Sequence, residues 1–165
     1  MTAFRIRPAA AADATLLADW AIAMALETEH KQLVPATVHA GVAAGIADAG
    51  KARYFIAMHD AALAGHETVG AAVGTLMLTS EWSDWRNGDW WWIQSVYVVP
   101  GHRRSGVFAA LYRHVEQLAR ATPGVVGLRL YVEKENAAAQ RTYATLGMVD
   151  AGYAMYESEF PSANP

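Results

Sequence analysis

The period of the apolar residues changes several times along the chain, and each change marks a boundary between predicted elements. Strand-like patterns are expected at residues 4–7, 54–58, 69–79, 93–99 and 125–132, with a final strand or pair of strands at 148–157. Helical spacing is expected after Asp13, over residues 35–49 and 107–120, and between Asn136 and Gly147. The order of these elements predicts a mixed α/β domain with helices on both faces of a central sheet.

Caps and turn residues set the expected ends of these elements. Asp13 is expected to cap the first helix, and Asn136 the last one. The second helix is expected to begin at Pro35 or at a Thr37 cap. Asn87-Gly88 is a turn signal inside the tryptophan-rich segment 80–92, which therefore should form a hairpin-like loop leading into the strand at residue 93.

Length and composition limit the classes of protein that fit. A chain of 165 residues fits one domain, so a single domain is expected over residues 1–165, with a loose C-terminal tail from about residue 159. The net charge of −3 argues against a general nucleic-acid binder. The sequence has no cysteine, which excludes disulfides, thiolate metal ligands and a cysteine nucleophile.

No metal or membrane partner is expected. The six histidines show no ligand spacing such as H-E-x-x-H, and the serines show no G-x-S-x-G motif. No uncharged run is long enough to span a bilayer, and the first residues offer no signal-peptide core. A cytoplasmic location is therefore expected.

The stretch from Trp91 to Leu111 combines a strand, a basic turn and the start of a helix. Pro100-Gly101 ends the strand, Arg103 and Arg104 follow, and Gly106 precedes the helix. A helix N-terminus presents unpaired N–H groups and a partial positive charge, so this loop suits a phosphate-bearing ligand. The loop lacks the pattern of a Walker A or G-x-G-x-x-G motif, and its two guanidinium groups fit a pyrophosphate.

The last predicted helix carries two further candidate functional groups, the amide of Asn136 and the phenol of Tyr143. Asn136 and Tyr143 are seven residues apart, so they share one helix face, with Gln140 between them. A capping asparagine and a partly buried tyrosine would also explain this pair without any ligand.

Together these motifs resemble the GNAT superfamily of acyl-CoA-dependent N-acetyltransferases. The resemblance rests on VVP at 98–100, RRSGVF at 103–108 and NAAAQRTYATLG at 136–147, in that order. The order of predicted strands and helices is similar as well, so the resemblance covers nearly the whole chain. It implies a GNAT-like fold and acetyl-CoA as the cofactor.

The resemblance also implies a role for individual residues on the cofactor side. The pantetheine arm would run along the strand end at Tyr97 and Val98, where the Val98 amide would polarise the thioester carbonyl. Asn136 would bind the cofactor arm, and Tyr143 would face the sulfur. Pyrophosphate would be held by the loop residues Arg103, Arg104, Ser105, Gly106, Val107 and Phe108.

Two positions depart from the family pattern. Phe108 stands where glycine or alanine is usual, which brings the phosphate geometry into question. Gln94 stands where many members carry a glutamate base, and glutamine cannot accept a proton. The carboxylates left for this role and for binding a cationic amine are Glu81 and Asp84, beside Trp82 in the tryptophan-rich segment, and Glu27 and Glu29 in the first helix.

The alternative for these acceptor-side residues is structural. Trp91 and Trp92 could belong to the core, Trp82 and Trp85 could cover a dimer contact, and the carboxylates could simply be solvated. A homodimer is compatible with the surplus of aromatic residues.

The sequence thus predicts an N-acetyltransferase that transfers an acetyl group from acetyl-CoA to a primary amine of a small, cationic acceptor. Without a cysteine, the simplest route is direct attack of the amine in a ternary complex. A protein N-terminus or lysine remains open as acceptor. The competing prediction is a non-catalytic acyl-CoA-binding or interaction module, suggested by Gln94 and Phe108. A single-strand nucleic-acid binder that stacks bases on the tryptophans is disfavoured by the acidic net charge.

Overall fold

The computed structural model describes residues 4–59 and 70–160. The chain forms two compact units, residues 1–131 and 132–165. The first unit carries the sheet and the helices α1, α2 and α3, and the second carries the helix α4. The expectation of a single domain over residues 1–165 stays a prediction.

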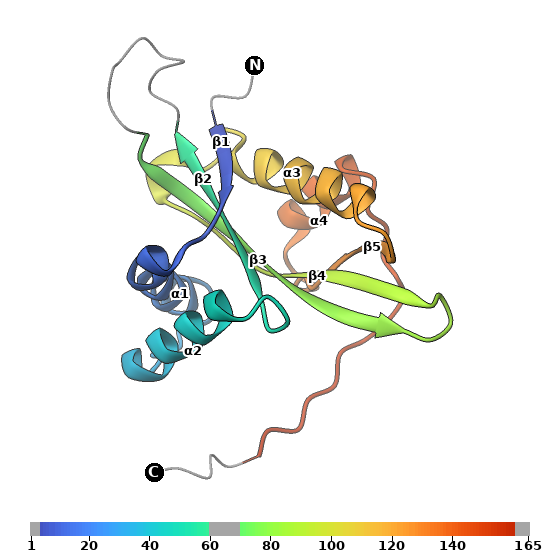
Figure 1. Cartoon of the computed structure of the whole chain (residues 1–165), viewed down its shortest axis with the longest axis horizontal. Coiled ribbons are helices and arrows are strands. Elements are labelled where there is room, and N and C mark those ends of the chain that lie inside the picture. The colour runs from blue at the N-terminus through green and yellow to red at the C-terminus, as the bar shows by residue number, and fades with distance from the viewer. Residues whose placement is uncertain (1–3, 60–69, 161–165) are drawn as a thin grey trace. The chain divides into compact units, whose positions relative to one another are not determined.

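The sheet of the first unit is mixed, as the pattern of the sequence predicts. Its strand order is β1-β2-β3-β4-β5, antiparallel from β1 to β4 and parallel between β4 and β5 (Figure 1). The strands are β1 (Phe4–Pro8), β2 (Arg53–His59), β3 (Ala72–Ser83), β4 (Gly88–Val98) and β5 (Val125–Leu130). The first residue of the strand expected at 69–79 lies outside the described residues.

The tryptophan-rich segment forms a long β-hairpin. Glu81 pairs with Trp90 and Ser83 with Gly88, so β3 and β4 both extend to the turn that contains Asn87. Asn87 has a φ of 47°, a left-handed conformation that asparagine tolerates in tight turns. The hairpin expected from Asn87-Gly88 is confirmed, and it is longer than the sequence indicated.

Helices cover both faces of this sheet. Consecutive residues of β2 point to opposite faces, and Ile56 packs with Leu17 and Val42, whereas the ring of Phe55 contacts His114, with centroids 5.3 Å apart. One face is therefore covered by α1 (Ala14–Glu29) and α2 (Pro35–Ala47), and the other by α3 (Val107–Ala121) (Figure 1). No described helix is long and apolar enough to cross a membrane.

The expected cap at Asp13 is wrong, although α1 begins directly after it. Asp13 makes no side-chain hydrogen bond to the first turn of α1. Its carboxylate instead accepts two hydrogen bonds from Arg7, each 2.8 Å, and one from the Ala10 amide at 2.7 Å. The Arg7 guanidinium thereby lowers the pKa of Asp13. A short 3-10 turn, η1 (Ala11–Asp13), already winds the chain into α1, so the aspartate backbone is helical and its side chain reaches back toward β1.

The second unit contains α4 (Ala137–Thr145). Its expected cap is confirmed, because Asn136 Oδ1 accepts a hydrogen bond from the Ala139 amide at 3.0 Å. The strand expected at 148–157 is wrong, since residues 148–160 form no strand. An extended segment becomes a strand only when a partner satisfies its backbone groups, and the side chains of this segment, such as Val149 and Tyr156, are exposed.

Candidate functional site

The end of β4 has an open backbone edge. β5 pairs with β4 only as far as Ile93, opposite Leu130, whereas β4 continues to Val98 against β3. Among the described residues, 95–98 therefore have a strand partner on one side only. An unpaired strand edge can bind an extended ligand through backbone hydrogen bonds.

Val98 directs its backbone toward this open edge. The Val99 amide donates to the Val73 carbonyl on β3 at 3.0 Å. Because neighbouring residues of a strand direct their amides to opposite sides, the Val98 amide points away from β3, and the Tyr97 amide points toward it. Of the two residues expected to bind the pantetheine arm, Val98 thus offers its backbone amide, whereas Tyr97 contacts α1 through its ring, 5.7 Å from that of Trp20.

The loop after β4 leads into the N-terminus of α3. A short 3-10 helix, η3 (Pro100–His102), is followed by left-handed backbone at Arg104, with a φ of 61°, and at Gly106, with a φ of 91°. Within the described residues, the amides of Ser105, Gly106 and Val107 have no acceptor. These free donors lie at the positive end of α3, an arrangement suited to an anion.

Phe108, the departure from the family pattern, lies in the first turn of α3. Its ring is partly buried, and its centroid is 6.1 Å from that of Tyr112, one turn further along the helix. The ring thus packs along α3 beside a neighbour of the same helix.

The two arginines of the loop have different partners. Arg103 lies 2.5 Å from Glu27 on α1, and its Nε donates to the Val98 carbonyl at 2.9 Å. The Tyr97 hydroxyl donates to the same Glu27 at 3.3 Å, and Glu27 raises the pKa of Arg103. Arg104 is exposed and has no ion-pair partner in the described part of the chain. Arg103 therefore ties the strand end to α1, while Arg104 is available to an anion.

Most residues expected on the acceptor side lie far from this strand end. Ser83 pairs with Gly88 at the tip of the hairpin and Gly74 with Val98 at its other end, so the tip is about 30 Å away along the strands. Glu81, Trp82 and Asp84 therefore lie near the hairpin tip, far from Val98. Of the residues predicted to bind the acceptor, only Glu27 lies beside the end of β4.

Each of the separated residues has local contacts. Glu81 accepts a hydrogen bond from Trp92 Nε1 and pairs with Arg129 at 2.9 Å. Asp84 accepts from the Trp85 amide at 2.9 Å in the turn. Trp82 is 60% exposed and Trp85 92%, so the dimer contact suggested for these two rings stays a prediction.

Gln94 lies in a β-bulge of β4 and bonds the neighbouring strand β3. The register of β3 and β4 shifts between Met77 and Leu78, which pair with Ser95 and Ile93 and leave Gln94 as the extra residue. Gln94 is exposed, and its amide nitrogen donates to the Thr79 hydroxyl at 2.9 Å.

A cavity that the sequence did not reveal lies between the first two helices and the sheet. Its volume is about 350 Å³. From α1, α2 and their connection it is lined by Leu17, Ala21, Met24, Ala25, Glu29, Lys31, Leu33 and Val42, and from the sheet by Tyr54, Thr75, Met77, Ser95 and Tyr97. The sequence signal for it was the alternation of Thr75 and Met77 and of Ser95 and Tyr97, which predicts a shared sheet face but not a cavity.

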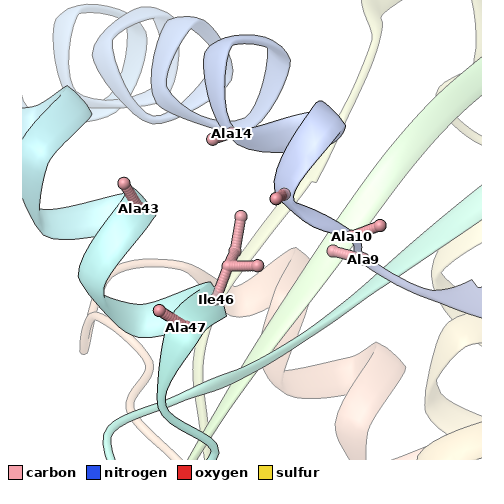
Figure 2. A pocket seen from close by; sticks show the side chains of 7 residues that line it. Ala9, Ala10, Ala14, Ala43, Ile46 and Ala47 are labelled. Atoms are coloured by element: carbon pink, nitrogen blue, oxygen red, sulfur yellow. The ribbon is translucent and has the colours of Figure 1, made fainter.

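A second, smaller pocket has no polar side chain to position a reacting group. It lies between α2 and the segment that leads into α1 and has a volume of about 260 Å³. Figure 2 shows its lining, which consists of Ile46 and the alanines 9, 10, 11, 14, 43 and 47. The larger cavity, which reaches Tyr97, is therefore the candidate acceptor pocket.

Asn136 and Tyr143 belong to the second unit. The Asn136 carbonyl oxygen is engaged in capping α4, and Gln140 donates to the Glu133 carbonyl at 3.1 Å. Tyr143 is partly buried, and burial raises the pKa of its hydroxyl. The cofactor-binding role of Asn136 and the catalytic role of Tyr143 stay predictions.

Gly74 lies where β3 meets both the end of β4 and the start of α3. A Cβ atom at this position would be 2.9 Å from the Tyr97 carbonyl oxygen and 2.9 Å from Val107 Cγ1. We expect Gly74→Ala to lower the free energy of unfolding by about 1–3 kcal/mol, because the contact with the Tyr97 carbonyl can be relieved only by moving the backbone and Val107 is buried. Urea denaturation measures this loss.

Gly41→Ala is the matched control for this substitution. Gly41 lies inside α2 with no atom within 4 Å of the added Cβ, so alanine should raise stability by about 0.5–1 kcal/mol. Equal stability of the two variants would contradict the tight approach at Gly74.

Comparison with known proteins agrees with this fold. The model of the acetyltransferase (GNAT) family matches residues 15–148. A possible acetyltransferase from Clostridium difficile 630 is 38% identical, with a TM-score of 0.84 over 96% of this chain and 98% of that one. No curated protein matches the chain.

Two solved structures with lower identity share the fold. A ribosomal-protein-alanine N-acetyltransferase from Brucella melitensis biovar Abortus 2308 is 16% identical, with a TM-score of 0.69 over 96% of this chain and 100% of that one. An aminoglycoside acetyltransferase from an uncultured soil metagenomic sample is 12% identical, with a TM-score of 0.73 over 96% and 97%. Since the family model covers most of the sequence and a relative is 38% identical over nearly all of it, the chain belongs to the GNAT acetyltransferase family.

Proposed function

We propose that this protein is an N-acetyltransferase that transfers an acetyl group from acetyl-CoA to a primary amine of a small acceptor. The open edge of β4, followed by the free amides at the start of α3, is the observation that carries this proposal. The amides of a pantetheine arm match the hydrogen-bonding groups of a strand edge, and a pyrophosphate matches a helix N-terminus. The donors present therefore fit the cofactor.

Acetyl-CoA supplies the acetyl group as a thioester. The Val98 amide, which points to the open edge, would donate a hydrogen bond to the carbonyl oxygen as negative charge develops there. The sequence contains no cysteine to accept the acetyl group, which supports direct attack by the amine. Tyr143 would donate a hydrogen bond to the departing sulfur, a role that suits a hydroxyl whose pKa is raised by burial.

The acceptor enters by the cavity next to this edge. Ser95 and Tyr97 line the cavity from β4, so it lies against the same strand that carries Val98. Of the carboxylates considered as bases, Glu29 lines the cavity and Glu27 hydrogen-bonds Tyr97 in its wall. We assign these two to the acceptor side in place of Glu81 and Asp84.

Binding and turnover test the proposal separately. Acetyl-CoA should raise the melting temperature of the purified protein, and a panel of primary amines should release free thiol from acetyl-CoA. Absence of both the thermal shift and thiol release, over a broad amine panel, would overturn the proposal.

A non-catalytic acyl-CoA-binding module is the second candidate. Gln94 favours it, because its amide bonds Thr79 and cannot accept a proton. This candidate predicts an acetyl-CoA-dependent thermal shift without thiol release, and the same cofactor binding in the Tyr143→Phe variant as in the parent protein.

A further inference from the structure

The walls of the candidate acceptor pocket are mainly apolar. Side chains of α1, α2 and their connection supply Met24, Leu33 and Val42, and β3 supplies Met77. The Thr75 hydroxyl is engaged, because it donates to the Phe55 carbonyl at 2.9 Å. Such a cavity favours a ligand with an apolar body, since burial of apolar surface is the main source of its binding energy.

The acidic groups near the pocket already have cationic partners. Glu29 at the cavity wall lies 2.7 Å from Lys31, and Glu27 beside Tyr97 lies 2.5 Å from Arg103. A ligand with several positive charges needs carboxylates to replace the water lost on binding. Because each of these two carboxylates is already paired with a cation, little net negative charge is left at the pocket to attract a polycation.

We infer that the acceptor is a primary amine with a compact apolar body, alkyl or aryl, and with no second positive charge. This inference rests on the proposed N-acetyltransferase function. The body lies against Met24, Leu33 and Met77, and the amine lies at the Ser95 and Tyr97 end, beside the β4 edge. The sequence predicts a cationic acceptor, with Glu27, Glu29, Glu81 and Asp84 as the available carboxylates, and we infer instead an acceptor whose only charge is its amine.

The reaction balances without any further reactant. The neutral amine nitrogen forms a bond to the thioester carbonyl carbon, and the bond from that carbon to sulfur breaks. The nitrogen loses one proton and the sulfur gains one, so the products are an amide and free coenzyme A.

A homologous series of n-alkylamines, from propylamine to hexylamine, tests the apolar pocket. Their amines have similar basicity, so chain length is the main variable. We expect each added methylene to raise kcat/KM by about fourfold until the cavity is filled. Spermidine and an aminoglycoside should give values at least about tenfold below that of hexylamine, in line with an unmatched buried charge.

Met77→Asp tests the charge argument directly. It places an unpaired carboxylate in the cavity wall, and we expect it to shift the ratio of kcat/KM for 1,6-diaminohexane over hexylamine upward by about tenfold or more. Ser80→Asp is the matched control, because it adds the same charge on the same strand at an exposed position outside the cavity. Leu33→Asp repeats the test at a side chain that is already 36% exposed, where folding tolerates a charge.

The outcomes separate this inference from the proposed function. A thermal shift with acetyl-CoA and turnover of spermidine at or above the rate of hexylamine, with no gain along the alkyl series, would overturn the inference alone. An unchanged substrate ratio in both Met77→Asp and Leu33→Asp would do the same. If no amine is acetylated and acetyl-CoA causes no thermal shift, the proposed function itself would be overturned.

Discussion

Arg104→Gln should weaken acetyl-CoA binding by about 10- to 100-fold, because a hydrogen bond between charged groups contributes about 1.5–3 kcal/mol. Arg104 is exposed at the start of the free amides before α3, with no ion-pair partner in the described part of the chain. Its positive φ already positions it in the turn, and glutamine keeps the length of the side chain while removing the charge. Isothermal titration of acetyl-CoA measures the loss, which should shrink as salt is raised.

Arg113→Gln provides the matched control for charge. Arg113 is exposed on α3 but lies two turns beyond the loop, so its replacement should change the dissociation constant by less than about twofold. Equal weakening by the two substitutions would show a general charge effect and contradict a phosphate contact at Arg104.

Arg103→Gln should behave differently from Arg104→Gln. It removes the ion pair to Glu27 and the hydrogen bond to the Val98 carbonyl, both of which hold the strand end against α1. We therefore expect a change in amine KM as well as in cofactor binding, because Glu27 also bonds Tyr97 in the pocket wall. An effect on cofactor binding alone would indicate that Arg103 leaves Glu27 to bind phosphate.

Leu111→Ala should lower the free energy of unfolding by about 2–5 kcal/mol, the range for a buried leucine whose removal leaves a cavity. Leu111 is fully buried between α3 and the sheet, together with Val107 and Val115. Because Val107 begins the helix that presents the free amides, loosening this contact should also weaken acetyl-CoA binding. Urea denaturation followed by circular dichroism measures the stability.

Leu118→Ala is the comparison within the same helix. From the helical spacing of apolar residues, Leu118 would be expected to be buried like Leu111, but in the structure it is 37% exposed. Its replacement should cost less than about 1 kcal/mol, because little area is removed from water on folding. Similar losses for the two variants would contradict the packing of α3 described above.

The elements themselves were largely predictable, because local chemistry specifies them. β-branched and aromatic residues specify the strands, Pro35 begins α2, Asn136 caps α4, and Asn87-Gly88 turns the hairpin. Asp13 was not predictable from its position before a helix, since the partner that its carboxylate takes, Arg7, lies on β1. The strand expected at 148–157 failed for a related reason, as its apolar pattern does not supply a partner strand.

The acceptor side shows the same limit. Glu81 and Gln94 lie on the same hairpin as Val98, yet the length of the hairpin separates Glu81 from Val98, and Gln94 lies in a one-residue bulge and bonds Thr79. A strand advances about 3.3 Å per residue and reverses its side chains at every step, so a small change in register moves a residue from one site to another.

By itself, then, the sequence determined the family pattern, the mixed α/β order of elements and the loop from Val98 to Phe108, because these depend on short motifs and on local backbone preferences. Only the tertiary structure decided that Arg103 pairs with Glu27 while Arg104 has no such partner in the described residues, and that an apolar cavity lies beside the end of β4. These contacts join residues up to 76 positions apart. They depend on how the helices pack on a bulged sheet, and local sequence patterns do not predict that packing.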